Sequence, residues 1–176
     1  MNLKALQTYR EKLKELKIWA QVKSPKPLQP AISYTLGWLS PELLGTGFRL
    51  IEISDFSMKA FIPAQAMNLD GDKEINQGLT LNGGLELTRT YMNKHWPETH
   101  YRIISSEMKM IKQQPWSKDI TLLLALTEGQ LDQFFIDLHA DKKATLELSI
   151  QVQIQNSKKP DRLDLKLICE ATHLLA

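Results

Sequence analysis

The stretch Asn82-Gly83-Gly84-Leu85-Glu86-Leu87-Thr88-Arg89-Thr90-Tyr91-Met92 decides the fold of this 176-residue chain. Asn82 is a residue type that caps the first turn of a helix, because its side chain accepts a hydrogen bond from a backbone N–H group. The residues after Asn82 give the helix a broad apolar surface. A helix that packs on the outside of a protein needs only a narrower apolar stripe. The sequence therefore predicts a helix over 82–95 that opens at Asn82 and is largely enclosed by a sheet.

Short apolar or alternating runs on both sides of this helix predict an antiparallel sheet. Two runs precede the helix, 48–53 and 58–62, and the polar turn Ser54-Asp55 between them indicates a hairpin. The runs that follow the helix are 101–111, 119–126, 144–155 and 162–174. A short helix opening at 127–130 and ending at Leu138 interrupts them. Helices segregated from an antiparallel sheet in this way define the α+β class.

The first 44 residues form a separate region of the sequence. Residues 2–22 predict an extra N-terminal amphipathic helix, which either packs on its own domain or lies on a membrane surface. Its apolar positions are Leu3, Leu6, Leu13, Leu16 and Ala20. Three prolines within 24–30 indicate a linker, and Ser40-Pro41-Glu42 is typical of a helix start. We expect residues 1–44 to be a helical extension and linker, and residues 45–176 to be the main domain.

Composition excludes several classes of function. The 22 basic and 20 acidic residues nearly cancel, whereas a nucleic-acid-binding domain usually has a strong basic excess, so no nucleic acid partner is expected. No apolar run reaches the length of about 18 residues that a membrane-spanning helix needs. The N-terminus also lacks the compact apolar core of a secretory signal. These features lead us to expect a cytoplasmic protein, with a membrane partner disfavoured.

Metal and thiol chemistry have little support in the sequence. Cys169 is the only cysteine, so the chain has neither an internal disulfide nor a paired-cysteine metal motif. The four histidines (His95, His100, His139 and His173) are scattered, and no two have the four-residue helical spacing of a metal site. We expect neither a metal nor a cofactor.

Residues 76–84, Asn-Gln-Gly-Leu-Thr-Leu-Asn-Gly-Gly, resemble the segment that opens the central helix in hotdog-fold acyl-CoA thioesterase-like proteins. The resemblance covers about residues 45–176 and includes the runs 106–115, 131–134 and 142–148. The runs 131–134 and 142–148 resemble a poorly characterised branch that includes a thioesterase-like domain sometimes fused to an acetyltransferase. The resemblance implies a hotdog fold, in which a long central helix is wrapped by a curved antiparallel sheet.

The resemblance also implies a site beside the glycine pair. Backbone N–H groups at the start of a helix can polarise a thioester carbonyl, and Gly83 and Gly84 have no side chains to keep the thioester away. Asn82 could donate its amide to the carbonyl or to an attacking water. The structural alternative is that Asn82 caps the helix while the two glycines allow close packing against the sheet. Sequence alone leaves both open.

A general base is harder to assign. In the phenylacetate-pathway branch of the family an aspartate comes seven residues after the second glycine, but here that position is Tyr91, a poor base at neutral pH. Glu86 is the nearest carboxylate on the helix and is the candidate catalytic base. Its structural alternative is an interaction with the helix dipole or with residues one turn on.

These expectations combine into one functional hypothesis and one alternative. The hypothesis is hydrolysis of an acyl-CoA-type thioester, with Asn82 and Glu86 catalytic and the remaining site residues binding substrate. Those binding residues are Asn76, Gly83, Gly84, Leu87 and Tyr91, and three lysines (Lys109, Lys112 and Lys118) could contact CoA phosphates. The alternative is a non-catalytic hotdog protein that binds an acyl or lipid-like ligand or serves as an assembly module. Open sheet edges favour a homodimer or a dimer of dimers.

Overall fold

The computed structural model describes residues 43, 45–95 and 101–172 of the chain. This part contains one antiparallel sheet with the strand order β1-β2-β4-β5-β6-β3. The strands are β1 (Arg49–Ile53), β2 (Ser57–Ile62), β3 (Tyr101–Ile111), β4 (Ile120–Ala125), β5 (Lys143–Ile154) and β6 (Asp161–Ala171). The helices are α3 (Gln77–His95) and α4 (Glu128–Asp141), and a 3-10 turn lies at Ala66–Asn68. The α+β class is confirmed, and so is the order of elements predicted for residues 45–172.

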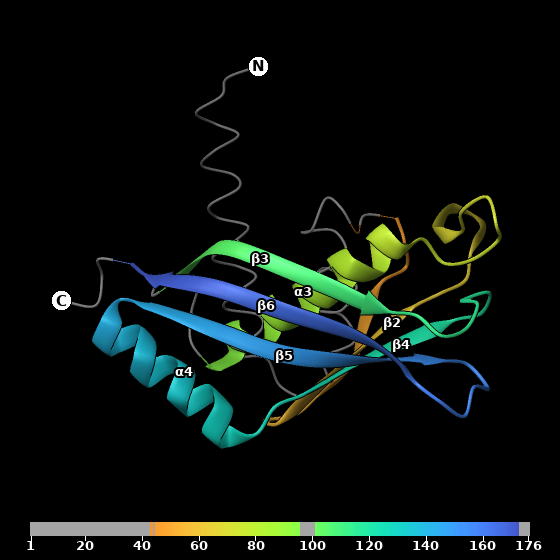
Figure 1. Cartoon of the computed structure of the whole chain (residues 1–176). Helices are drawn as coiled ribbons and strands as arrows, with labels where there is room; N and C mark the ends of the chain where they lie inside the picture. The colour runs from red at the N-terminus through yellow and green to blue at the C-terminus, as the bar shows by residue number, and fades with distance from the viewer. Residues whose placement is uncertain (1–42, 44, 96–100, 173–176) are drawn as a thin grey trace, which may run out of the picture.

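The long helix α3 lies against one face of the twisted sheet and crosses behind its strands (Figure 1). It packs mainly on β2 and also contacts β4 and β6, so strands from both halves of the sheet meet the same helix. The second helix, α4, packs on β5 and to a lesser extent on β6. Helix α3 is therefore the central element around which the core is built.

Side-chain alternation along the strands explains which face of the sheet is buried. Every second residue of β5 is buried and every other one is exposed over all 12 positions. The period of two puts successive side chains on opposite faces, so β5 contributes a continuous apolar row to the core. Its buried residues are Ala144, Leu146, Leu148, Ile150, Val152 and Ile154. The alternation read from the sequence was sufficient to place this strand.

The predicted start of the central helix is wrong by five residues. Helix α3 begins at Gln77, and Asn76 caps it, because its Oδ1 accepts a hydrogen bond from the backbone N–H of Leu79 at 3.2 Å. Asn82 is an exposed residue in the second turn. The error has a physical cause. Glycine inside a helix costs about 1 kcal/mol relative to alanine, so a glycine pair suggests a helix end unless tertiary contacts compensate.

Some predictions lie outside the described residues. These are the amphipathic helix over 2–22, the linker over 24–30 and the helix start at 40–42. The division into an extension over 1–44 and a main domain over 45–176 likewise stays a prediction. Within the residues that the structure does describe, neither helix combines the length and the apolar character that crossing a membrane requires.

Candidate functional site

The glycine pair sits where α3 comes closest to the sheet. A Cβ atom on Gly83 would lie 3.1 Å from Ile62 Cδ1 and 3.3 Å from Leu122 Cδ1. A Cβ atom on Gly84 would overlap the Cδ2 methyl of Leu163. The space beside both glycines is therefore filled by core side chains. This supports the alternative in which the glycines permit close packing, and it leaves no room for a thioester against their backbone in this conformation.

Leu87 and Tyr91 lie on the same sheet-facing side of α3, and both side chains are fully buried. The Tyr91 hydroxyl donates a hydrogen bond of 2.8 Å to the backbone carbonyl of Asp55, in the turn between β1 and β2. Burial, and secondly the charge of Asp55, raise the pKa of Tyr91 above its ordinary value of 10.0. Tyr91 therefore remains protonated at neutral pH and acts as a structural donor that ties the helix to the hairpin.

A different face of α3 carries polar residues. Asn82 is exposed, and Glu86, four residues later, is only 5% exposed. Residues four apart on a helix lie on the same face, one turn from each other. Thr90 and Asn93 continue this polar stripe and are buried. Asn82 and Glu86 thus lie one helical turn apart on α3, with the Asn82 side chain exposed and the Glu86 side chain buried.

The polar stripe of α3 reaches the start of β3. The hydroxyl of Tyr101, the first residue of that strand, donates a buried hydrogen bond of 2.9 Å to Asn93 Oδ1. Since β3 is an edge strand of the sheet, the stripe runs from the solvent-exposed Asn82 towards a sheet edge.

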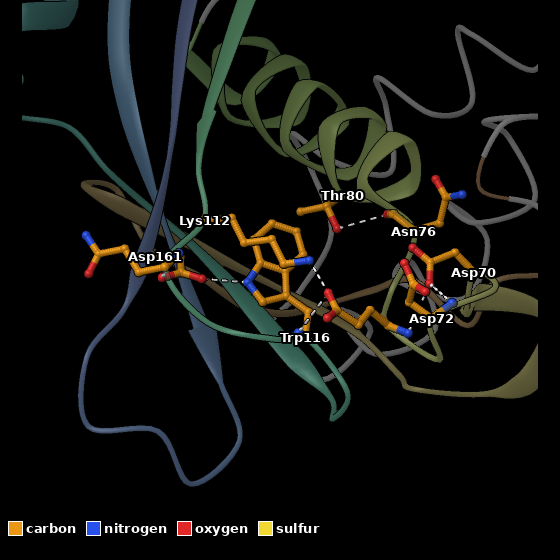
Figure 2. Close-up of polar contacts among 9 residues, drawn as sticks. Asp70, Asp72, Asn76, Thr80, Lys112, Trp116 and Asp161 are labelled. Atoms are coloured by element: carbon orange, nitrogen blue, oxygen red, sulfur yellow. Dashed lines mark hydrogen bonds and ion pairs between the residues drawn. The ribbon is translucent and has the colours of Figure 1, made fainter.

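A second polar cluster, which the sequence did not reveal, surrounds the start of α3 (Figure 2). Asp70 Oδ1 accepts hydrogen bonds from the backbone N–H groups of Asp72 at 3.0 Å and of Glu74 at 3.1 Å. The Glu74 carboxylate forms an ion pair with Lys112, which follows β3. Lys112 is consequently engaged within the protein, which weakens its assignment as a phosphate contact. These bonds shape the loop that delivers Asn76 to the helix start.

The deepest member of this cluster is Trp116, which is fully buried. Its indole N–H donates a hydrogen bond of 2.6 Å to Asp161 Oδ2 (Figure 2), and Asp161 Oδ1 accepts one of 3.1 Å from the backbone N–H of Gln113. The backbone carbonyl of Trp116 accepts a bond of 2.8 Å from the N–H of Ile75. Asp161 is itself 2% exposed. These bonds join three connections of the fold: the loop before α3, the segment between β3 and β4, and the turn that leads into β6. They serve packing rather than catalysis.

Other reactive groups are poorly placed for chemistry. Burial raises the pKa of the Cys169 thiol from 9.0 to about 12, so its nucleophilic thiolate is scarce near neutral pH. Across residues 43, 45–95 and 101–172, no three histidine, cysteine or acidic side chains are grouped to hold a metal ion. The candidate site therefore reduces to the face of α3 that carries Asn82 and Glu86, with Asn76 at the helix start on another face.

Known structures share this architecture, although the sequence matches no family model and no curated protein. The Pseudomonas aeruginosa protein PA5026, of unknown function and described as a probable thioesterase, has a TM-score of 0.69 and 13% identity, over 86% of this chain and 99% of its own. A Chlorobaculum tepidum protein of unknown function has a TM-score of 0.61 and 16% identity, over 82% and 98%. A thioesterase family protein from Silicibacter pomeroyi has a TM-score of 0.55 and 6% identity, over 79% and 94%.

These neighbours include thioesterase-family proteins of the hotdog fold, and the expectation of that fold is confirmed. In this chain the fold consists of a long helix against a six-stranded antiparallel sheet. At identities this low the likeness establishes the fold alone. An activity has to be argued from the residues of this chain.

Proposed function

We propose that this chain hydrolyses an acyl-CoA-type thioester on the face of α3 that carries Asn82 and Glu86. The observation that carries the proposal is the placement of Glu86, a carboxylate 5% exposed on the central helix of a hotdog fold. Burying a carboxylate costs free energy, so a protein retains one where it has a structural or chemical use. Its neighbour Asn82 is exposed to solvent and offers an amide to an incoming substrate.

The two side chains suit the two requirements of thioester hydrolysis. The Asn82 amide donates to the carbonyl oxygen and stabilises the oxyanion that forms when water attacks the carbonyl carbon. Glu86 accepts a proton from the attacking water as general base. When the tetrahedral intermediate collapses, the carbon–sulfur bond breaks and the proton passes from Glu86 to the departing sulfur. The products are a carboxylic acid and a free thiol.

The other residues predicted for the site act by holding helix α3 in place. Gly83, Gly84, Leu87 and Tyr91 hold α3 close against the sheet, which fixes the position of the helix that carries Asn82 and Glu86. Asn76 fixes the start of the helix through its bond to Leu79. In this proposal they act on the substrate through the position of the helix.

Replacing Glu86 with glutamine is expected to lower kcat/KM for the best acyl-CoA substrate by about 100-fold, because the base is lost while the shape is kept. Asn82→Ala is expected to lower it to a similar extent, by about 100-fold, through loss of the oxyanion donor. Steady-state assays over short, medium and long acyl-CoAs measure both effects. The matched control is Glu52→Gln, the same change at a half-exposed surface glutamate on β1. Full activity in Glu86→Gln would refute the assignment of the base.

The second candidate function is a non-catalytic acyl-binding protein. It is favoured by Tyr91, which stands where the phenylacetate-pathway branch of the resembling family has an aspartate and which here is buried and bonded to Asp55. The same substrate panel separates the two functions. A wild-type protein that binds acyl-CoAs, measured by calorimetry, yet hydrolyses none of them would establish the binding function in place of the enzymatic one.

We further propose that the functional unit is a homodimer paired along β3. Among the described strands β3 hydrogen-bonds only to β6, so it forms an edge of the described sheet at which a second copy could pair. The polar stripe of α3 ends at Tyr101 of this strand. Pairing there would place the partner beside the Asn82 and Glu86 face and enclose the substrate.

The dimer is tested by adding a charge to each sheet edge in turn. Ile104, on β3, is 44% exposed, and Ile51, on the opposite edge strand β1, is 51% exposed. Ile104→Lys is expected to convert the dimer into a monomer, as measured by light scattering coupled to size exclusion. Ile51→Lys is the matched control and is expected to leave the dimer intact. The reverse pattern would move the interface to β1.

A further inference from the structure

Arg89, on helix α3, differs from the other arginines that the structure describes. For Arg89, residues 43, 45–95 and 101–172 provide neither a hydrogen bond nor an ion pair, although it is partly buried. A guanidinium carries a permanent charge and five N–H donors, so one in this state is suited to an anion that a ligand brings. The other described arginines are engaged: Arg49 lies over the Phe61 ring, Arg102 pairs with Glu170, and Arg162 pairs with Asp164.

Arg89 shares one side of α3 with the proposed catalytic pair. It follows Glu86 by three residues and Asn82 by seven, and positions at these spacings line one side of an α-helix. Side chains on a helix lean towards its N-terminus, so the Arg89 side chain leans towards the turn that carries Glu86. A three-residue spacing permits an ion pair, but the structure forms none between Arg89 and Glu86. The positive charge is therefore not neutralised by the proposed base.

An apolar residue separates the amide of Asn82 from the guanidinium of Arg89. Leu85 lies three residues after Asn82 and four before Arg89, and it is partly buried against the core. The order along this side of α3 is therefore a neutral donor, an apolar side chain and a cation. An acyl thioester whose chain ends in a carboxylate has the matching order of carbonyl, methylene groups and anion.

Distances along the helix decide which anion fits. Seven residues advance about 10.5 Å along a helix axis, and the longer Arg89 side chain, which leans back towards Asn82, shortens this gap to roughly 6–7 Å. The nearest phosphate of CoA is about 13 bonds from the thioester sulfur, or roughly 15 Å in an extended arm. A carboxylate at the end of a five- or six-carbon acyl chain is about 5–6 Å from the thioester carbonyl carbon. The spacing therefore fits the carboxylate of the acyl chain better than a CoA phosphate.

We propose that Arg89 binds a carboxylate at the far end of the acyl chain, so that the substrate is a dicarboxylic acyl thioester of about five or six carbons. The proposal rests on the proposed function, because it places the thioester carbonyl beside Asn82 and Glu86. The planar guanidinium donates two parallel N–H bonds to the two carboxylate oxygens. Holding the chain at this second point orients the carbonyl for attack by water, while Leu85 covers the methylene groups between the two ends.

A pair of substrates that differ only at the chain end tests this in the full-length protein. The wild type is expected to have a higher kcat/KM for glutaryl-CoA than for pentanoyl-CoA, and Arg89→Gln is expected to lower that ratio by about 10- to 100-fold. The matched control is Arg162→Gln, because Arg162 alternates with the buried Leu163 and so points away from α3. A wild type that prefers pentanoyl-CoA, or an unchanged ratio in Arg89→Gln, overturns the proposal.

Substrates without phosphate distinguish the two sources of the anion. Glutaryl-pantetheine keeps the carboxylate and lacks every phosphate of CoA, so Arg89→Gln is expected to lower its kcat/KM by the same factor as for glutaryl-CoA. Arg89→Lys is expected to lose less than Arg89→Gln, because lysine keeps the charge but not the two-point geometry. If Arg89→Gln impairs pentanoyl-CoA as much as glutaryl-CoA and leaves glutaryl-pantetheine unaffected, Arg89 binds a phosphate and the proposal fails.

Binding measurements separate a failure of this proposal from a failure of the proposed function. Calorimetry with glutaryl-CoA on Glu86→Gln, and on the same variant combined with Arg89→Gln, requires no hydrolysis. The Arg89 substitution is expected to weaken binding of glutaryl-CoA by about 10- to 100-fold and to leave binding of pentanoyl-CoA unchanged. This result supports the role of Arg89 even if the wild type hydrolyses nothing. Equal binding of glutaryl-CoA by both proteins overturns that role, whether or not the wild type is an active thioesterase.

Discussion

Replacing Trp116 with alanine is expected to lower the free energy of unfolding by about 3–5 kcal/mol, the usual cost of emptying a large aromatic site in a core. Trp116 is fully buried. Its side chain donates to Asp161 at the start of β6, and its backbone accepts from Ile75, two residues before α3. The substitution therefore removes apolar burial and also leaves the Asp161 carboxylate without its indole partner. Urea denaturation monitored by circular dichroism measures the loss.

Trp116→Phe separates these two contributions. It keeps most of the ring volume but deletes the N–H donor, so a buried carboxylate oxygen of Asp161 loses its partner. That loss is expected to cost about 1–3 kcal/mol, less than the alanine substitution. An alanine variant that loses under 1 kcal/mol, which is well below the range for buried aromatics, would contradict the description of Trp116 as the residue that joins the three connections.

Replacing Gly84 with valine is expected to destabilise the protein by about 2–3 kcal/mol, because extra atoms forced into a packed core displace their neighbours. Even a Cβ atom would overlap Leu163 Cδ2 and lie 3.3 Å from Ile150 Cδ1. Both of these side chains are fully buried, so they have little space into which to move. The expected response is a shift of α3 away from the sheet, visible as a lower denaturation midpoint.

The matched control for Gly84→Val is Gly129→Val. Gly129 lies in the first turn of α4, and a Cβ atom there would meet nothing within 4 Å. Helix propensity alone slightly favours valine over glycine, so the control is expected to be neutral or slightly stabilising. If both valine variants lose the same stability, the effect belongs to the residue type and the close approach at Gly84 is not its cause.

The two stability experiments also bear on the proposed site. Trp116 and the Glu74–Lys112 pair hold the loop before α3, and Gly84 sets how deeply the helix sits. Both act on the helix that carries Asn82 and Glu86. A milder change such as Trp116→Phe is therefore expected to affect activity only through stability, whereas Glu86→Gln is expected to affect activity with the fold retained.

Strand positions were readable from the residues because the signal is local. In β5, and in β6 from Leu163 onward, every second residue is apolar, and a period of two assigns each side chain to a face without knowledge of the rest of the chain. The strand predicted over 101–111 coincides with β3, and the predicted turn at Ser54-Asp55 separates β1 from β2. The order of helix and strands, and with it the α+β class, follows from such local patterns.

The start of the central helix depended on contacts that are distant in sequence. Asn76 and Asn82 are equally good caps as residue types, and the glycine pair after Asn82 made that position the more plausible start. The helix is capped at Asn76 because distant side chains fill the space beside Gly83 and Gly84. These side chains are Ile62, Leu122 and Leu163. These side chains come from β2, β4 and β6, and packing with them offsets the cost of glycine inside a helix.

Local residue patterns thus determined the class of the fold, the strands and the existence of the central helix. Assembly in three dimensions decided the rest: where that helix begins, that Trp116 meets Asp161 across 45 residues, and that Glu86 is buried while Asn82 is exposed. The reason is physical. Strand alternation and capping act over a few residues, whereas burial and side-chain contact depend on which distant segments the folded chain brings together.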